Sequence, residues 1–300
     1  MNMSVKIAGV EFKNPVMEAS GTFGSGMEYS EFVDLSRLGA VVTKGVANVP
    51  WPGNPTPRIA ETYGGMINAI GLQNPGIDVF AKRDIPFLKK YDTKIIVNVC
   101  GHAPEEYLAV VERLADEPID MMEINISCPN VNAGFLAFGQ DAKHVEELTA
   151  QIKKIAKQPI IMKLTPNVTD ITEIAKAAEA GGADALSLIN TLTGMKIDIN
   201  RRTFAVANKT GGVSGPVVHP IAVRMVYQTA QAVNIPIIGM GGIATPEDAI
   251  EMILAGASAV SVGTANFYNP NATIEIIDGI EAYMKKNGFE SVKDMVGIVK

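Results

Sequence analysis

Cysteine is scarce in this chain of 300 residues, which contains only Cys100 and Cys128. Two cysteines outside any C-x-x-C pair cannot build a disulfide framework, and an iron–sulfur cluster usually takes about four cysteine ligands. The three histidines are scattered as well, without the H-E-x-x-H spacing of a zinc site. The sequence therefore predicts no metal site in this chain and a reducing, cytoplasmic setting.

Long apolar runs and an excess of positive charge are also lacking. No stretch approaches the roughly 20 apolar residues of a membrane-spanning helix, and the opening MNMSVKIAGVEFKNP has no apolar signal core. Lysine and arginine number 26 against 32 aspartates and glutamates, which gives a net charge of −6. An acidic chain is a poor partner for nucleic acid or for an anionic membrane, so we expect it to bind neither.

What the chain does contain is a repeat of short apolar runs and amphipathic helices. Residues 105–117 and 142–158 each place apolar side chains along one helical face. We predict strands at Ala40–Thr43, Ile95–Val99, Met121–Ile126, Ile160–Leu164, Ala185–Ile189, Ile235–Met240 and Ala259–Val262. Strands separated by helices indicate a parallel sheet. With Gly211–Gly215 as the eighth strand, between the fifth and the last two, the α/β chain would form one (β/α)8 TIM barrel over residues 1–300. An open doubly wound sheet is the alternative.

Two insertions interrupt this repeat. Val46–Pro75 is rich in proline and glycine, and Thr191–Thr210 contains KIDINRRTFAVAN, which we predict to form a hairpin. Long insertions that follow barrel strands usually serve the site at the C-terminal rim of the barrel. We therefore expect both insertions at that rim.

Polar residues recur where the predicted strands end, namely Lys44, Asn98, Asn125, Lys163 and Asn190. Any one of them could be a strand end turning toward water. Five at equivalent positions favour a ligand site, because barrel enzymes take their catalytic residues from the C-terminal ends of several strands. Amides offer a donor and an acceptor together, which suits the edge of a pyrimidine or flavin ring. Buried lysines can balance a carboxylate, a phosphate or a reduced flavin.

Glycine-rich turns follow the last two predicted strands, at Gly239–Ile243 and Ser261–Ala265. Each could be an ordinary tight turn. Together they favour a phosphorylated ligand, because glycine lets backbone N–H groups approach a phosphate at a helix N-terminus. The stretch Ser20–Gly26 lacks the G-x-G-x-x-G spacing, so we reject a dinucleotide-binding loop there.

Taken in order, these motifs resemble the dihydroorotate dehydrogenase family, class 1, and within it the NAD-linked 1B type. The motifs are Lys44-Gly45, Asn68–Leu72, Asn125–Asn130, Asn190-Thr191, Gly241-Gly242 and Gly263-Thr264. Residues 52–76 and 189–199 are the most specific stretches, and the resemblance covers nearly the whole chain.

The resemblance implies an FMN-containing barrel that oxidises (S)-dihydroorotate to orotate in de novo pyrimidine biosynthesis. Residues implied to bind FMN are Ser20, Lys44, Gly45, Asn98, Asn125, Lys163, Ile189, Gly215, Gly241, Gly242, Gly263 and Thr264. Residues implied to bind substrate are Lys44, Asn68, Ala69, Ile70, Gly71, Leu72, Asn125, Asn190 and Thr191. Cys128 would be the catalytic base that takes the C5 proton, while the hydride passes to N5 of FMN.

The 1B type implies an electron-transfer partner subunit that carries FAD and a [2Fe-2S] cluster and reduces NAD, in a heterotetramer around a catalytic-subunit homodimer. The quinone-reducing class uses a serine base and an N-terminal hydrophobic extension, neither of which we find here. Three alternatives stay open. One is the 1A type, a homodimer that uses fumarate. The others are a non-redox phosphate-binding isomerase or lyase acting through Lys44 or Lys163, and a binding module without catalysis. We also expect Cys100 to be a packed core thiol and Trp51 to pack within the first insertion.

Overall fold

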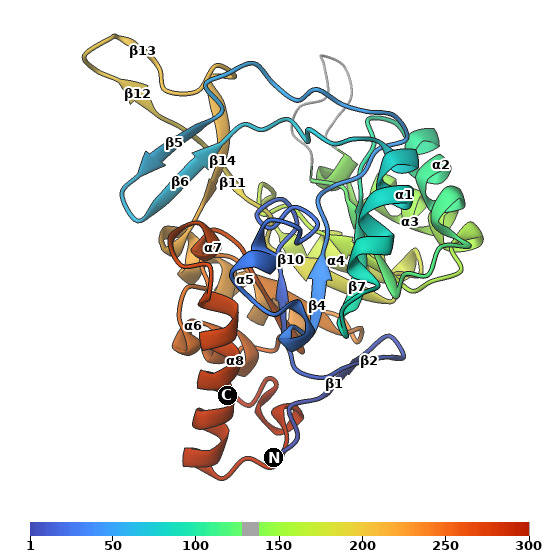
Figure 1. Ribbon diagram of the computed structural model, residues 1–300, viewed down its shortest axis with the longest axis vertical. Coiled ribbons are helices and arrows are strands. Elements are labelled where there is room, and N and C mark those ends of the chain that lie inside the picture. Colours follow the sequence, from blue (N-terminus) through green and yellow to red (C-terminus); the bar gives the residue numbers. More distant parts are fainter. Residues whose placement is uncertain (128–137, 300) are drawn as a thin grey trace.

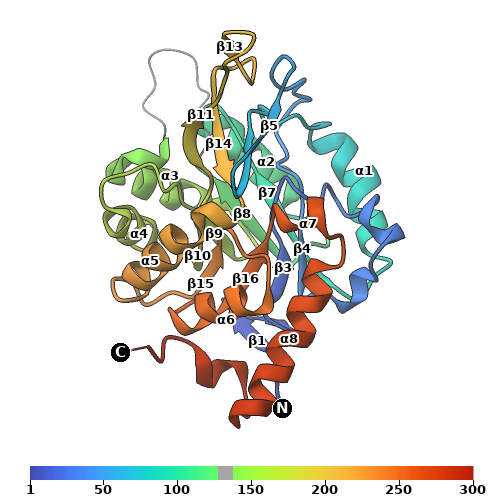
Figure 2. The same cartoon turned by 90° about the vertical axis from the view of Figure 1, so that its left-hand side faces the viewer.

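The computed structural model describes residues 1–127 and 138–299. In this part of the chain, eight parallel strands close into a barrel (Figures 1 and 2). In spatial order they are β3 (Val16–Glu18), β4 (Ala40–Val42), β7 (Lys94–Val99), β8 (Met121–Asn125), β9 (Ile160–Lys163), β10 (Ala185–Leu188), β15 (Ile237–Met240) and β16 (Ala259–Val262). β16 pairs in parallel with β3 and so completes the ring. The predicted (β/α)8 barrel is confirmed.

The barrel strands are buried on both faces, which explains why they appear in the sequence as continuous apolar runs. In β7, Ile95, Ile96, Val97 and Val99 are at most 1% exposed. The barrel wall and the helices around it share one continuous core. Full burial of such a side chain in this core contributes about 1.5–3 kcal/mol to the stability of the fold. A polar residue in this wall therefore needs a partner.

Helices form the outer layer of the barrel (Figure 2). They are α1 (Ile77–Leu88), α2 (Pro104–Leu114), α3 (Ala142–Ile155), α4 (Ile171–Ala180), α5 (His219–Ala230), α6 (Pro246–Leu254), α7 (Ala265–Tyr268) and α8 (Ala272–Asn287). Their starts follow the sequence signals. The Asp170 side chain accepts from the Thr172 N–H, and Thr245 and Asp248 form a complete capping box. The two helices predicted from periodicity are confirmed as α2 and α3.

The prediction that Gly211–Gly215 forms the eighth barrel strand is wrong. That segment is β14 (Thr210–Ser214), which pairs antiparallel with β11 (Leu192–Met195) outside the barrel. Residues 196–209 between them contain a hairpin and no helix, so the chain turns back antiparallel instead of crossing over. The missing barrel strand is β3, which has only three residues and contains a glutamate, so it carries no apolar run.

Glu18 of β3 faces outward from the barrel, toward the helices at the end of the chain. Its neighbour Met17 pairs with Ser261 of β16, while Glu18 accepts a 2.6 Å hydrogen bond from Nδ2 of Asn266 in α7. The Glu18 side chain is 0% exposed, and its Oε1 has no hydrogen-bond partner among the described residues. β3 thus places a buried acid between the barrel wall and its outer layer.

The two insertions combine into one antiparallel sheet. β5 (Ile59–Thr62) and β6 (Gly65–Asn68) come from the first insertion, and β6 pairs with β14, giving the order β11-β14-β6-β5. The predicted hairpin is confirmed as β12 (Ile197–Asp198) and β13 (Thr203–Phe204). This sheet and hairpin lie at the end of the barrel away from the N-terminus (Figure 1).

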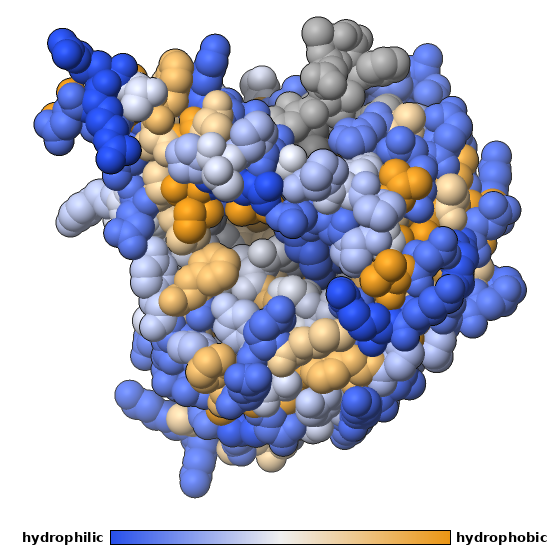
Figure 3. Space-filling model, turned by 45° about the horizontal axis from the view of Figure 1, so that its top comes forward, coloured by the Kyte–Doolittle hydropathy of each residue, from blue (hydrophilic) through white to orange (hydrophobic). Residues whose placement is uncertain are grey.

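Beneath the barrel, β1 (Val5–Ile7) and β2 (Val10–Phe12) form a small antiparallel hairpin near the N-terminus (Figure 1). The outer surface in Figure 3 is mostly hydrophilic, with hydrophobic side chains in separate groups. In the described ranges no helix combines the length and apolar character needed to cross a bilayer.

Candidate active site

Polar side chains from four neighbouring strands meet inside the C-terminal end of the barrel. Asn98 comes from β7, Glu123 from β8, Lys163 from β9 and Ser187 from β10. All four are at most 4% exposed. The structure therefore brings together two of the strand-end residues that the sequence predicted, Asn98 and Lys163, and it adds a carboxylate and a hydroxyl to them.

Glu123 is the centre of this cluster. Its Oε1 accepts from Nδ2 of Asn98 at 2.6 Å and lies 3.4 Å from Nζ of Lys163, while its Oε2 accepts from Oγ of Ser187 at 2.8 Å. The sequence reasoning missed Glu123. The signal that could have identified it is its position two residues before Asn125 in the same strand, because residues two apart on a strand share a face.

A second lysine, Lys44, lies two residues beyond β4. A Cβ on Gly21 would lie 3.7 Å from its Nζ, so the loop after β3 passes close to this ammonium group. Burial lowers the pKa of Lys44; Cys100 acts in the opposite direction, and the positive charge of Lys163 lowers the pKa further. Two lysines and one carboxylate leave this end of the barrel with a positive charge that an anionic ligand can neutralise.

The predicted amides of β8 and of the turn after β10 also meet. Nδ2 of Asn190 donates to Oδ1 of Asn125 at 3.3 Å, and the backbone N–H of Ser127 donates to the same oxygen at 3.2 Å. Oδ1 of Asn190 accepts from the backbone N–H of Thr191 at 2.8 Å. The hydroxyl of Tyr107 donates to the backbone oxygen of Asn125 at 2.8 Å, which anchors the end of β8 on α2.

The first insertion returns Asn68–Leu72 to the same end of the barrel. Asn54 fixes this segment, because its backbone N–H donates to the oxygen of Ile70 and its side chain donates to the oxygen of Ala69, both at 3.0 Å. A Cβ on Gly45 would lie 3.5 Å from Leu72 and 2.9 Å from Oδ1 of Asn98. The segment therefore lies beside Gly45, which follows Lys44 in the chain.

The glycine turns after β15 and β16 lie next to each other. Gly241 and Gly242 have φ of +126° and +69°, which only glycine adopts without strain. A Cβ on Gly242 would lie 2.7 Å from the oxygen of Gly215 and 2.8 Å from the backbone nitrogen of His219 at the start of α5. Ile189 lies against Gly241, because a Cβ on Gly241 would lie 3.2 Å from the side chain of Ile189.

A pocket of about 440 Å³ opens at these turns. Gly215, Gly242 and Thr264 line it from the barrel side, and Thr264 donates to Oγ of Ser214 in β14 at 2.8 Å. Glu61 and Thr62 of β5 line the other side, so the sheet built from the insertions helps to form the pocket. Sequence reasoning placed the insertions at the rim but did not identify these two residues.

Cys128, the predicted base, lies outside the described residues. Cys100 is 0% exposed, which confirms the predicted core thiol. The Trp51 backbone pairs with Asn74 of the same insertion, but the Trp51 ring stacks on His102, outside the insertion, with ring centroids 3.9 Å apart. Gly263 lies near Ala19 in the loop that carries Ser20, since a Cβ on Gly263 would meet Ala19 at 3.5 Å.

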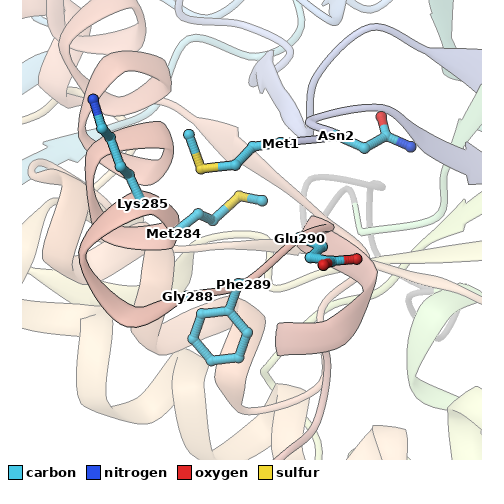
Figure 4. Close-up of a pocket in the computed structure, with 7 residues that line it drawn as sticks. All are labelled: Met1, Asn2, Met284, Lys285, Gly288, Phe289 and Glu290. Atoms are coloured by element: carbon cyan, nitrogen blue, oxygen red, sulfur yellow. The ribbon is translucent and has the colours of Figure 1, made fainter.

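A second hollow of about 740 Å³, drawn in Figure 4, contains none of these residues. Its labelled side chains come from the first two residues and from the end of α8 with the turn that follows. It lies at the opposite end of the barrel from the sheet of the insertions (Figure 1). The cluster at the C-terminal strand ends is therefore the candidate active site.

A closed parallel barrel with its polar side chains gathered at the C-terminal strand ends defines a (β/α)8 barrel enzyme. The sequence pattern of one such family, described as "Dihydroorotate dehydrogenase", matches residues 2–284. The chain belongs to the dihydroorotate dehydrogenase family, which confirms the resemblance seen in its motifs.

Highly similar relatives share one name, "Dihydroorotate dehydrogenase B (NAD(+)), catalytic subunit". The protein of this name from Lachnoclostridium phytofermentans is 70% identical over 100% of both chains. That from Alkaliphilus metalliredigens is 64% identical over 99% of this chain and 98% of its own. That from Caldicellulosiruptor bescii is 53% identical over 100% of this chain and 99% of its own.

Proposed function

We propose that this chain is the catalytic subunit of an NAD-linked enzyme that oxidises (S)-dihydroorotate to orotate in pyrimidine biosynthesis. The single observation that carries the proposal is the meeting of Lys44, Asn125 and Asn190 with the buried Glu123–Lys163 pair at one end of the barrel. Full-length identity of 70% to a relative of that name supports the NAD-linked type.

The residues present fit FMN. Oδ1 of Asn98 is buried and has no hydrogen-bond partner in the described part of the chain, so it can accept from a ring N–H. Lys163 supplies a buried cation near it, and the turns at Gly241-Gly242 and Gly263-Thr264 suit a phosphate. The residues proposed to hold FMN are Ser20, Lys44, Gly45, Asn98, Asn125, Lys163, Ile189, Gly215, Gly241, Gly242, Gly263 and Thr264. When bound, FMN supplies the hydride acceptor.

The chain's own residues bind the substrate and remove its proton. The Lys44 ammonium pairs with the substrate carboxylate, and the amides of Asn68, Asn125 and Asn190 match the alternating N–H and C=O groups of its ring. Segment 69–72 and Thr191 complete the substrate site and exclude water from it. Sγ of Cys128 accepts the C5 proton, for which a thiolate is well suited.

Electrons leave through a partner subunit. With two cysteines the chain cannot ligate a [2Fe-2S] cluster in the usual four-cysteine manner, and it has no dinucleotide loop at Ser20–Gly26. We therefore assign FAD, the [2Fe-2S] cluster and the NAD site to the partner. The assembly we propose is a cytoplasmic heterotetramer around a homodimer of this chain.

The test of this function uses the purified chain, incubated with excess FMN and desalted. We expect it to stay yellow and to lose its flavin absorbance when dihydroorotate is added without oxygen. Orotate should then form in the steady state with an artificial electron acceptor, and NAD should be reduced only when the partner subunit is added. A chain that stays colourless would exclude the redox function, and turnover with fumarate but not with partner and NAD would indicate the 1A type.

Replacing Lys44 by methionine is expected to weaken orotate binding by about 10- to 100-fold, the usual contribution of a hydrogen bond to a charged group. In the unmodified protein, orotate affinity should fall as the pH rises, because Lys44 loses its charge when it is deprotonated. Since burial lowers the pKa of Lys44, this fall should begin at a lower pH than it would with an ordinary lysine. Titration of bound-flavin absorbance with orotate measures both effects. Affinity equal to wild type in the Lys44→Met variant would remove Lys44 from the substrate site.

A further inference from the structure

Glu123 has no role in the chemistry described above, yet it is the acid around which the site is built. The side chain is 2% exposed and receives hydrogen bonds from Asn98 at 2.6 Å and from Ser187 at 2.8 Å, with Nζ of Lys163 at 3.4 Å. Three donors converge on one carboxylate. An ionised carboxylate only accepts hydrogen bonds, so this arrangement suits the anion.

The contact with Glu123 fixes which end of the Asn98 amide is available. Since the carboxylate accepts, the Asn98 group at 2.6 Å must be the NH2 end. The carbonyl oxygen Oδ1 is then left buried, without a hydrogen-bond partner among the described residues. A buried acceptor in that condition costs free energy until a ligand donates to it. The space beside it is kept open at Gly45, where a Cβ would come within 2.9 Å of Oδ1.

Glu123 holds Lys163 in a similar way. The Lys163 side chain is 5% exposed and its ammonium lies 3.4 Å from Oε1 of Glu123. An ammonium has three N–H donors, so pairing with one carboxylate oxygen leaves donors for a ligand. Asn98 and Lys163 then offer an acceptor beside a donor, the pattern that matches a ring N–H next to a ring carbonyl.

We propose that Glu123 is a positioning residue that fixes the amide of Asn98 and the ammonium of Lys163 in the orientation that binds the pyrimidine edge of FMN. The inference rests on the proposed function and deepens it. Glu123 acts through its two neighbours, and its negative charge also offsets the positive charge of Lys163 beside the flavin. It follows that loss of the carboxylate changes both the affinity for FMN and the redox potential of the bound flavin.

The test compares Glu123→Gln with Glu18→Gln, a matched change of a second buried strand glutamate that faces outward from the barrel. A glutamine at 123 can accept through only one oxygen and carries no charge, so it holds the Asn98 amide and the Lys163 ammonium more weakly than the carboxylate does. We expect FMN to bind Glu123→Gln about 10- to 100-fold more weakly than wild type. The readout is quenching of FMN fluorescence on titration with apoprotein.

The midpoint potential of the bound flavin is the readout that a merely structural role would not move. Without Glu123, the charge of Lys163 acts unopposed and stabilises the more negative, reduced flavin, so the potential should shift to more positive values. Burial raises the pKa of Glu18 to about 8, so that side chain is neutral at pH 7 and Glu18→Gln changes no charge. We therefore expect wild-type affinity and potential in Glu18→Gln at pH 7.

A double-mutant cycle with Asn98→Ala separates positioning from a general loss of stability. If Glu123 acts through Asn98, the effect of Glu123→Gln on FMN affinity should shrink in the Asn98→Ala background. Wild-type affinity and potential in Glu123→Gln, or full additivity with Asn98→Ala together with an unshifted potential, would overturn the proposal. A wild-type chain that binds no FMN would instead refute the proposed function, and this inference with it.

If Glu123→Gln does not fold, as judged by circular dichroism, the Ser187→Ala variant tests the positioning role instead. It removes one donor from Glu123 and leaves the carboxylate in place, so FMN should bind about two- to tenfold more weakly. Unchanged FMN affinity in a folded Ser187→Ala variant would then count against the positioning role.

Discussion

Replacing Cys128 by alanine is expected to slow flavin reduction by dihydroorotate by about 10²- to 10⁴-fold, the usual contribution of a general base. The variant should still be yellow and should still bind orotate, because none of the side chains proposed to hold FMN or the substrate ring is changed. A thiol with an ordinary pKa near 8.5 is partly ionised near neutral pH, and nearby cations increase that fraction. Rapid mixing with dihydroorotate in the absence of oxygen measures the rate directly.

The second cysteine gives the matched control for this experiment. Cys100→Ala removes the same atom from a site that is 0% exposed, where the cysteine packs and interacts electrostatically with Lys44, and we expect the rate to stay within a few-fold of wild type. Flavin reduction at a near-normal rate in Cys128→Ala would remove Cys128 from the role of base. Loss of bound FMN from that variant would show that the cysteine serves binding instead.

Replacing Glu18 by glutamine is expected to stabilise the protein above pH 8 by roughly 5 kcal/mol. Burial raises the pKa of Glu18 from the ordinary value of 4.5 to about 8, and the hydrogen bond from Asn266 only partly opposes this rise. A folded chain at high pH must therefore hold an ionised carboxylate in an apolar layer. Glutamine is neutral at every pH and removes that cost.

The sign of the pH dependence follows from the raised pKa. Below pH 4.5 the folded and unfolded chains both hold the proton, so Glu18 contributes no slope. Between pH 4.5 and about 8 the folded chain keeps a proton that the unfolded chain has released, so stability falls as the pH rises. Above about pH 8 both forms are ionised and the loss is complete.

Urea unfolding at pH 5, 7 and 9 measures this dependence, and the exposed Glu31→Gln variant is the control. We expect wild type and Glu18→Gln to differ little at pH 5 and most at pH 9, while Glu31→Gln follows wild type throughout. Parallel pH profiles of wild type and Glu18→Gln would show that Glu18 does not titrate in this range.

Much of the site could be predicted because its residues stand at strand ends. Lys44, Asn98, Asn125, Lys163 and Asn190 were found from sequence, since the C-terminal ends of parallel barrel strands meet whatever their exact register. Glu123 was missed because a glutamate inside an apolar run does not show which donors it will meet. Its partners lie 25, 40 and 64 residues away in the chain, and only closure of the barrel places them around one carboxylate.

The assignment of strands has a similar limit. β3 was overlooked because three residues that include a glutamate give no apolar run, and β14 was misplaced because a local pattern does not state its partner. Pairing of β14 with β6 joins residues as far apart as Met66 and Ser214, and no local signal specifies that pairing. The sheet of the insertions, and the part that it plays in the pocket, could not be predicted for this reason.

The barrel class, the strand-end residues and the family can be predicted from the sequence, because they depend on local periodicity and on motifs of adjacent residues. Folding in three dimensions sets which strand closes the barrel, which carboxylate orders the site and where the insertions meet. Those outcomes depend on contacts between residues far apart in the chain, and burial in three dimensions sets their energies. Glu18 and Glu123 are the same residue type on two strands of one barrel. Among the described residues, one faces the outer helices with an oxygen that has no hydrogen-bond partner, and the other faces three donors.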